Sequence, residues 1–223
     1  MDTVTLSKQN RLFWLGRYAD RVYATVRLMI RELDKLIDDR AIDYAGYCRR
    51  LGIPCPYTSG QDFCRRYLFD SQDPNSVRAC VDNMLGNGIV LRETITSPTL
   101  AYLQMAQSAM DLASRSESPA VELQWVLDDI MAFWGSFDYS VDAEEARNIT
   151  KAGGLVENLS LMLRLGLGGE RLDLDLKKLL NRLYKTDLKA RPEALAVIEA
   201  RVMEQKPVPD EELLRAVEGL FQL

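Results

Sequence analysis

The stretch LGRYADRVYATVRL, from Leu15 to Leu28, decides the fold. A weaker copy, AGGLVENLSLMLRL, follows at Ala152–Leu165, and an offset of 137 residues (from 15 to 152) aligns the two. In both copies the apolar residues are alternately three and four positions apart, which is the periodicity of a packed α-helix. These residues are Leu15, Ala19, Val22 and Val26 in the first copy, and Ala152, Val156, Leu159 and Leu163 in the second. The pattern predicts two related helices and a degenerate internal repeat.

Helical signals continue along nearly the whole chain, and no strand-like alternation interrupts them. The first periodic segment predicts a long helix from about Ser7 to Asp39. An N-cap residue followed by proline marks three further helix starts, at Asp73-Pro74, Ser97-Pro98 and Ser118-Pro119. Further helices are expected at Ile42–Leu51, Asp62–Phe69, Asn75–Ile95, Thr99–Ser114, Ala120–Phe133, Asp142–Gly166, Asp173–Leu188, Pro192–Glu204 and Asp210–Phe221. The sequence therefore predicts an all-α bundle of about six long helices with short peripheral helices.

Domain boundaries are marked weakly. A chain of 223 residues is long enough for one large core. The element Pro207-Val-Pro209 separates the last helix from the rest of the chain. We therefore expect a single all-helical domain over residues 1–206 and a C-terminal helical arm over residues 207–223.

Composition and charge exclude several classes of function. The formal net charge of −5 argues against a nucleic-acid-binding surface, which is normally basic. The chain has no histidine, so catalytic systems and metal sites that require an imidazole are excluded. The N-terminus lacks the basic and apolar regions of a signal peptide, and the longest uncharged run, Thr94–Met110, is too polar to span a bilayer. We therefore expect a cytoplasmic protein without a membrane or nucleic-acid partner.

The four cysteines lie close together in the sequence, at Cys48, Cys55, Cys64 and Cys80. They form no CxxC pair, and there is no histidine to complete a zinc site. Buried thiols without chemistry are the simplest interpretation, with metal binding and redox chemistry as alternatives. No metal and no cofactor are expected.

A second stripe on the first helix carries charge. Its members are four or three positions apart, as are those of the matching stripe in the second copy. The stripes are Phe13, Arg17, Asp20, Ala24 and Arg27 in the first copy, and Thr150, Gly154, Glu157, Leu161 and Arg164 in the second. Arg21 lies beside Asp20, and Asn158 replaces it in the second copy.

Three interpretations of the charged stripe stay open. It forms a buried ion network that fixes helix register, or a pocket in which Arg17, Arg21, Arg27 and Arg164 bind an anionic or amide-bearing ligand. In the third interpretation, Asp20 and Glu157 act as a catalytic acid and base.

The segment FWLGRYADRVYATVRLM resembles the opening of the alpha-E domain family, all-helical bacterial proteins with a Glu-Arg motif. Asp20 stands where the family has glutamate, and the segments DFCRRYLFDSQDPNSV and LGNGIVLRE resemble further family patterns. The second motif, at Glu157-Asn158, is degenerate, with Gly154 and Asn158 in place of arginine. In the segment LGNGIVLRE, Gly86 stands in place of glutamate. The residues that match at the first motif are Trp14, Leu15, Gly16, Arg17, Tyr18, Arg21 and Arg27. The resemblance covers about Leu6 to Gly166 and indicates a shortened, motif-degenerate member.

What the resemblance implies about function comes from the genes that accompany the family. They encode an ATP-grasp amidoligase and a transglutaminase-like protein, which indicates a peptide synthesis or modification system. The expectation is therefore a helical accessory protein that binds such a partner or a peptide or amino-acid ligand. The alternative is an enzyme that acts on a peptide or amino acid through Asp20, Glu157 and the clustered arginines.

Overall fold

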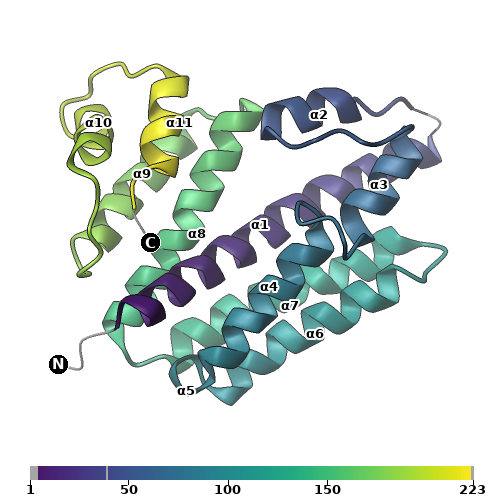
Figure 1. Ribbon diagram of the computed structural model, residues 1–223, viewed down its shortest axis with the longest axis horizontal. Coiled ribbons are helices and arrows are strands. Elements are labelled where there is room, and N and C mark those ends of the chain that lie inside the picture. The colour runs from purple at the N-terminus through teal and green to yellow at the C-terminus, as the bar shows by residue number, and fades with distance from the viewer. Residues whose placement is uncertain (1–4, 39, 222–223) are drawn as a thin grey trace. The chain divides into compact units, whose positions relative to one another are not determined.

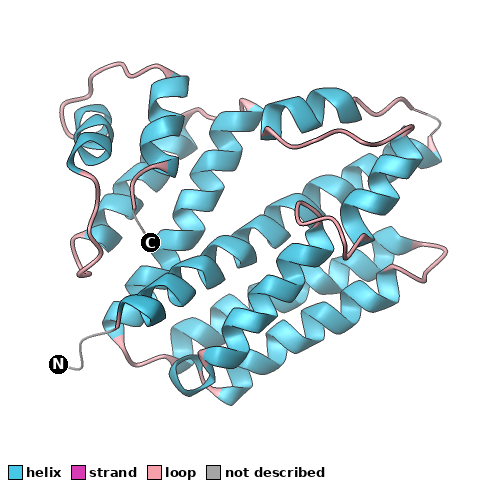
Figure 2. Cartoon of the chain, in the orientation of Figure 1, coloured by secondary structure: helices cyan, strands magenta, loops and turns pink. Residues whose placement is uncertain are grey.

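The computed structural model describes residues 5–38 and 40–221, and the regular elements in these ranges are all helices (Figure 2). The only strand-like pairing among these residues is one isolated bridge between Ala190 and Phe221. Six helices have 14 residues or more: α1 (Leu6–Ile37), α4 (Val77–Val90), α6 (Ser97–Ala113), α7 (Pro119–Ser140), α8 (Glu144–Leu165) and α9 (Glu170–Leu183). The shorter ones are α2 (Tyr44–Leu51), α3 (Gly60–Phe69), α5 (Arg92–Ile95), α10 (Pro192–Val202) and α11 (Asp210–Glu218). The predicted all-α fold with about six long helices is confirmed.

The chain folds as two compact units. Unit 1 contains residues 1–17 and 143–223, and unit 2 contains residues 18–142. The first boundary falls inside α1, so its first three turns belong to unit 1 and the remainder to unit 2. The expectation of one domain over residues 1–206 with an arm over residues 207–223 stays a prediction.

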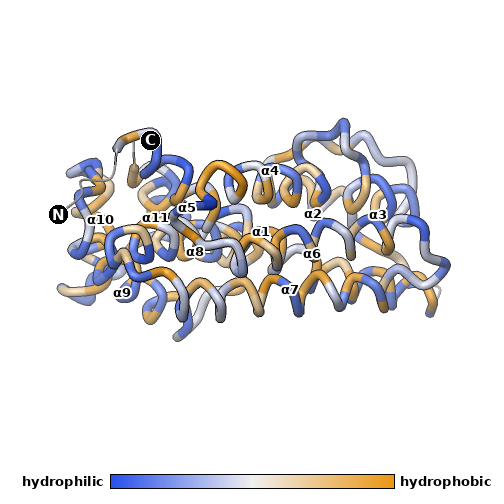
Figure 3. Tube along the Cα trace, turned by 90° about the horizontal axis from the view of Figure 1, so that it is seen from below, coloured by the Kyte–Doolittle hydropathy of each residue, from blue (hydrophilic) through white to orange (hydrophobic). Residues whose placement is uncertain are grey.

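Unit 2 is built on the antiparallel hairpin of α6 and α7 (Figure 1). α4 packs on α6, and α3 packs on α4. Apolar and polar segments alternate along α7 when the chain is coloured by hydropathy (Figure 3), as expected for a helix with one face in a core. Large side chains with no exposed surface fill this core: Phe63, Met84, Leu103, Met110, Leu123, Phe133 and Phe137.

Unit 1 is centred on α8, against which α9 and α11 pack (Figure 1). α10 packs on α9 and α11. The described part of the C-terminal segment therefore contributes to the core of this unit through Leu213, Val217 and Leu220, each at most 1% exposed.

The predicted start of the helix over Asn75–Ile95 is wrong by two residues. α4 begins at Val77, and the hydroxyl of Ser76 caps it by accepting a hydrogen bond from a backbone N–H of its first turn at 3.0 Å. The carboxylate of Asp73 accepts a hydrogen bond from the backbone N–H of Asn75 at 2.9 Å instead. Asp73 therefore forms an Asx turn that precedes the helix.

Candidate functional site

Two glycines bring the first turns of α1 into backbone contact with α8. A β-carbon on Gly16 would lie 1.8 Å from the carbonyl oxygen of Thr150, and one on Gly153 would lie 2.0 Å from that of Phe13. The 137-residue offset aligns Gly16 with Gly153 and Phe13 with Thr150, so it exchanges the two contacts. The contacts at the crossing are therefore related as by a local twofold axis.

The ion pair between Arg17 and Glu157 lies next to this crossing. Nε and Nη2 of Arg17 each lie 2.8 Å from the same carboxylate oxygen, Oε2 of Glu157. The Glu157 side chain is 2% exposed and that of Arg17 is 15% exposed. The guanidinium carbon of Arg17 also lies 4.8 Å from the ring centroid of Trp14, within the range of a cation–π contact. The two partners of this buried ion pair therefore come from the two sequence copies, Arg17 from the first and Glu157 from the second.

The equivalent of Arg17 in the second copy is Gly154, which is buried beside the crossing. The repeat therefore carries this arginine only in the first copy. A glycine there permits close helix approach, and the nitrogen of Gly154 lies 2.9 Å from the position of a β-carbon on Gly16.

Arg164, a predicted ligand-binding residue, pairs with α11. Its Nε lies 2.8 Å from Oε1 of Glu218, and its Nη2 lies 2.9 Å from Oε2. This bidentate geometry is the strongest arrangement between an arginine and a carboxylate. The pair links α8 to α11, the last helix of unit 1. No pattern in the sequence predicted this contact.

Three predicted site residues lie on the part of α1 that belongs to unit 2. Asp20 and Arg21 are partly buried and both interact with neighbouring groups, whereas Arg27 is exposed. The use of Asp20 and Glu157 as an acid–base pair, with Arg17, Arg21, Arg27 and Arg164 as anion ligands, stays a prediction.

Sequence reasoning missed a buried carboxylate on α9. Asp175 is 1% exposed, and its carboxylate accepts hydrogen bonds from Arg171 at 3.0 Å, from Lys178 at 2.8 Å and from the side-chain amide of Asn158 at 3.0 Å. Burial alone would raise the pKa of Asp175, but the hydrogen bonds from Lys178 and Arg171 outweigh it and lower that pKa below its ordinary value. The i, i+4 spacing of Arg171 and Asp175 was the available signal. Asn158, the repeat equivalent of Arg21, thus donates a hydrogen bond to a carboxylate of its own unit.

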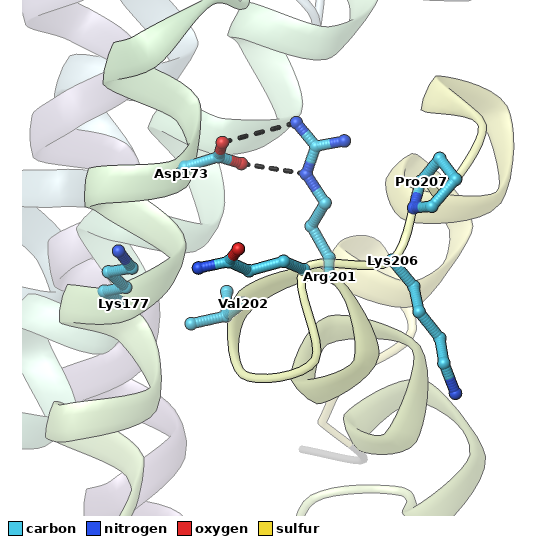
Figure 4. Close-up of a pocket in the computed structure, with 7 residues that line it drawn as sticks. Asp173, Lys177, Arg201, Val202, Lys206 and Pro207 are labelled. Atoms are coloured by element: carbon cyan, nitrogen blue, oxygen red, sulfur yellow. Dashed lines mark hydrogen bonds and ion pairs between the residues drawn. The ribbon is translucent and has the colours of Figure 1, made fainter.

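A polar cavity of about 400 Å³ lies between α9 and the end of α10 (Figure 4). Nε of Arg201 lies 2.8 Å from Oδ1 of Asp173 and Nη2 lies 3.4 Å from Oδ2, which closes one side of the cavity. Lys177 and Lys206 add positive charge to the lining. Gln205 adopts a left-handed backbone with φ of 53°, where helix ends usually carry glycine. The cavity can hold a small polar group, and no sequence motif marked it.

The cysteines are free thiols, three of them buried and Cys55 exposed. Burial raises the pKa of Cys64 to about 12, so this thiol is neutral at physiological pH. In the part of the chain that the structure describes, no group of three or more Cys, Asp or Glu side chains is placed to hold a metal ion.

The fold and the site together define an all-helical protein in which two related helices cross at glycines beside a buried arginine–glutamate pair. The chain belongs to the Alpha-E family, described as a predicted alpha-helical domain with a conserved ER motif, which it matches over residues 8–189. The predicted family membership is thereby confirmed. No curated protein and no solved structure matches the chain. None of the described helices is long and apolar enough to cross a membrane.

Proposed function

We propose that this Alpha-E protein is a helical accessory protein that binds a partner enzyme or a peptide substrate. It would serve a bacterial peptide synthesis or modification system that contains an ATP-grasp amidoligase and a transglutaminase-like protein. The resemblance of its first motif to the family supports this assignment.

The observation that carries the proposal is the state of the charged stripe in unit 1. Glu157 is held by two nitrogens of Arg17 in a place where it is almost fully buried. A carboxylate so placed is a strong structural partner, because breaking a buried ion pair costs about 3–5 kcal/mol. A general base must reach a proton of the substrate, and the polar cavity between α9 and α10 is lined by neither Glu157 nor Asp20. These facts favour a structural role over catalysis at the stripe.

Co-purification tests the proposal directly. The full chain, with an affinity tag, is expressed together with an ATP-grasp protein encoded next to it, and the eluate is analysed by size-exclusion chromatography with light scattering. We expect a stoichiometric complex that withstands gel filtration. An unrelated helical protein of similar net charge, carrying the same tag, is the control. An inert monomer that binds no co-encoded protein would contradict the proposal.

A further inference from the structure

The apolar face of α1 is fully buried over only part of the length of the helix. Val22, Val26 and Met29 have no exposed surface. The next two positions of the same periodicity, Leu33 and Leu36, are partly exposed. A core-facing position that stays exposed leaves an apolar surface available to a ligand.

Leu33 and Leu36 line a cavity of about 320 Å³ in unit 2. α3 contributes Cys64 and Phe69 to its wall, and the end of α6 and the start of α7 close the other side with Ala113 and Pro119. The volume lies at the lower end of the range for small-ligand sites, which are mostly apolar with a few polar groups. The cavity therefore suits one apolar side chain or a ligand of similar size.

Arg65 supplies a positive charge to this cavity. It is exposed on α3, and the described residues provide no hydrogen bond or ion pair to it. The adjacent Arg66 is engaged, because it donates to the carbonyl of Pro56 at 3.2 Å and its guanidinium carbon lies 5.5 Å from the ring centroid of Tyr57. Of these two neighbouring arginines, Arg65 is the one available to a ligand.

The other polar groups of the lining are neutral. Gln61 and Ser116 can donate hydrogen bonds to a carboxylate, whereas the hydroxyl of Ser114 donates to the carbonyl oxygen of Asp111 at 2.8 Å. Cys64 is a neutral thiol because burial raises its pKa to about 12. The nearby charges of Glu32 and Lys35 compensate each other in an ion pair at 2.7 Å. No carboxylate therefore lines the cavity to neutralise Arg65. The chain as a whole has a net charge of −5, which repels anions elsewhere on its surface.

We propose that this cavity binds the C-terminal residue of a peptide that ends in an aliphatic side chain. The side chain lies between Leu33, Leu36 and Phe69, and the terminal carboxylate accepts hydrogen bonds from Arg65. The assignment rests on the proposed function in peptide binding and names the class of ligand. Charge complementarity selects a free carboxylate, and the apolar wall selects the side chain.

Calorimetric titration of the purified full chain tests the cavity. The probes are acetyl-Ala-Ala-Leu with a free carboxylate, its C-terminal amide, and octanoate. We expect the free acid to bind about tenfold more tightly than the amide, because only the acid forms the charge-assisted contact. Arg65→Gln should reduce binding of the acid to the level of the amide. Arg49→Gln, an exposed helix arginine outside the cavity, is the matched control and should change nothing.

The apolar wall needs a separate variant. Leu36→Gln should weaken the acid and the amide alike, and circular dichroism melts of all variants confirm that they fold. Equal affinity for acid and amide, an unchanged Arg65→Gln variant, or no binding of any probe would overturn the proposal. Binding of octanoate without binding of the peptide would also overturn it and assign the cavity to a free fatty acid. The titration contains no partner enzyme. A negative titration therefore leaves the co-purification result unaffected, and a negative co-purification leaves the titration result unaffected.

Discussion

At the scale of single residues, two buried carboxylates differ in their relation to the sequence repeat. Glu157 belongs to the charged stripe that the sequence repeat marks, and Asp175 lies on a helix outside the repeat. Each is about 1% exposed and each is compensated by basic side chains. A buried charge without such partners would be expensive, so both carboxylates depend on their neighbours.

The lowered pKa of Asp175 predicts a dependence of stability on pH. Its pKa in the folded chain lies below the ordinary value of about 3.9, so the ionised form contributes stability above that value. This contribution is lost as the pH falls through the folded-state pKa. Asp175→Asn should therefore lower stability at neutral pH and flatten the acid dependence below about pH 5. Urea unfolding at a series of pH values measures both effects, and an acid slope equal to that of the unsubstituted chain would contradict the assignment.

At the scale of helices, the glycine crossing predicts a contrast between two alanine substitutions. Gly153→Ala places a β-carbon 2.0 Å from a backbone oxygen of α1, so the helices must move apart. We expect a loss of about 1–3 kcal/mol or more, as for overpacked cores. Gly86→Ala is the control, because no atom lies within 4 Å of its β-carbon and it should stabilise α4 by about 0.5–1 kcal/mol. Denaturant unfolding measures both, and equal effects would refute the crossing.

The two glycines of α4 also show what the sequence could predict at this scale. Glycine inside a helix is costly, so a close helix approach is the simplest explanation for both. A β-carbon on Gly88 would lie 2.5 Å from a methyl group of Leu103, as such an approach requires, whereas Gly86 faces open space. Residues two positions apart in a helix point about 200° apart, so one neighbour cannot contact both. Periodicity predicts which positions of a helix face inward. It does not predict the distance to the neighbouring helix, because that distance depends on the side chains of that helix.

Helix existence was predictable because it depends on local periodicity and capping. The contacts of the site were only partly predictable. The repeat aligns Gly16 with Gly153, the two glycines at which the helices cross, and the stripe contains both Arg17 and Glu157. The Asn158–Asp175 bond and the Arg164–Glu218 pair join helices through packing that no local pattern encodes. Both cavities likewise arise where several helix ends meet.

At the scale of the whole molecule, the two units differ in what they can bind. Unit 1 contains a polar cavity whose arginine is already paired with Asp173. Unit 2 contains an apolar cavity beside Arg65, for which the described residues supply no partner. In unit 1, the charged residues of the motif helices form ion pairs that join one helix to another. If the protein binds a peptide or a partner as proposed, the surfaces that do so would lie away from that motif.

The central claim is that the charged stripe of unit 1 maintains the fold. A double-mutant cycle on Arg17→Gln and Glu157→Gln, followed by denaturant unfolding, tests it most directly. Each single substitution leaves the partner charge buried and should cost about 3 kcal/mol or more, whereas the double variant should lose less than the sum. We predict a coupling free energy of at least about 1.5 kcal/mol. Additive effects within about 0.5 kcal/mol would contradict the account.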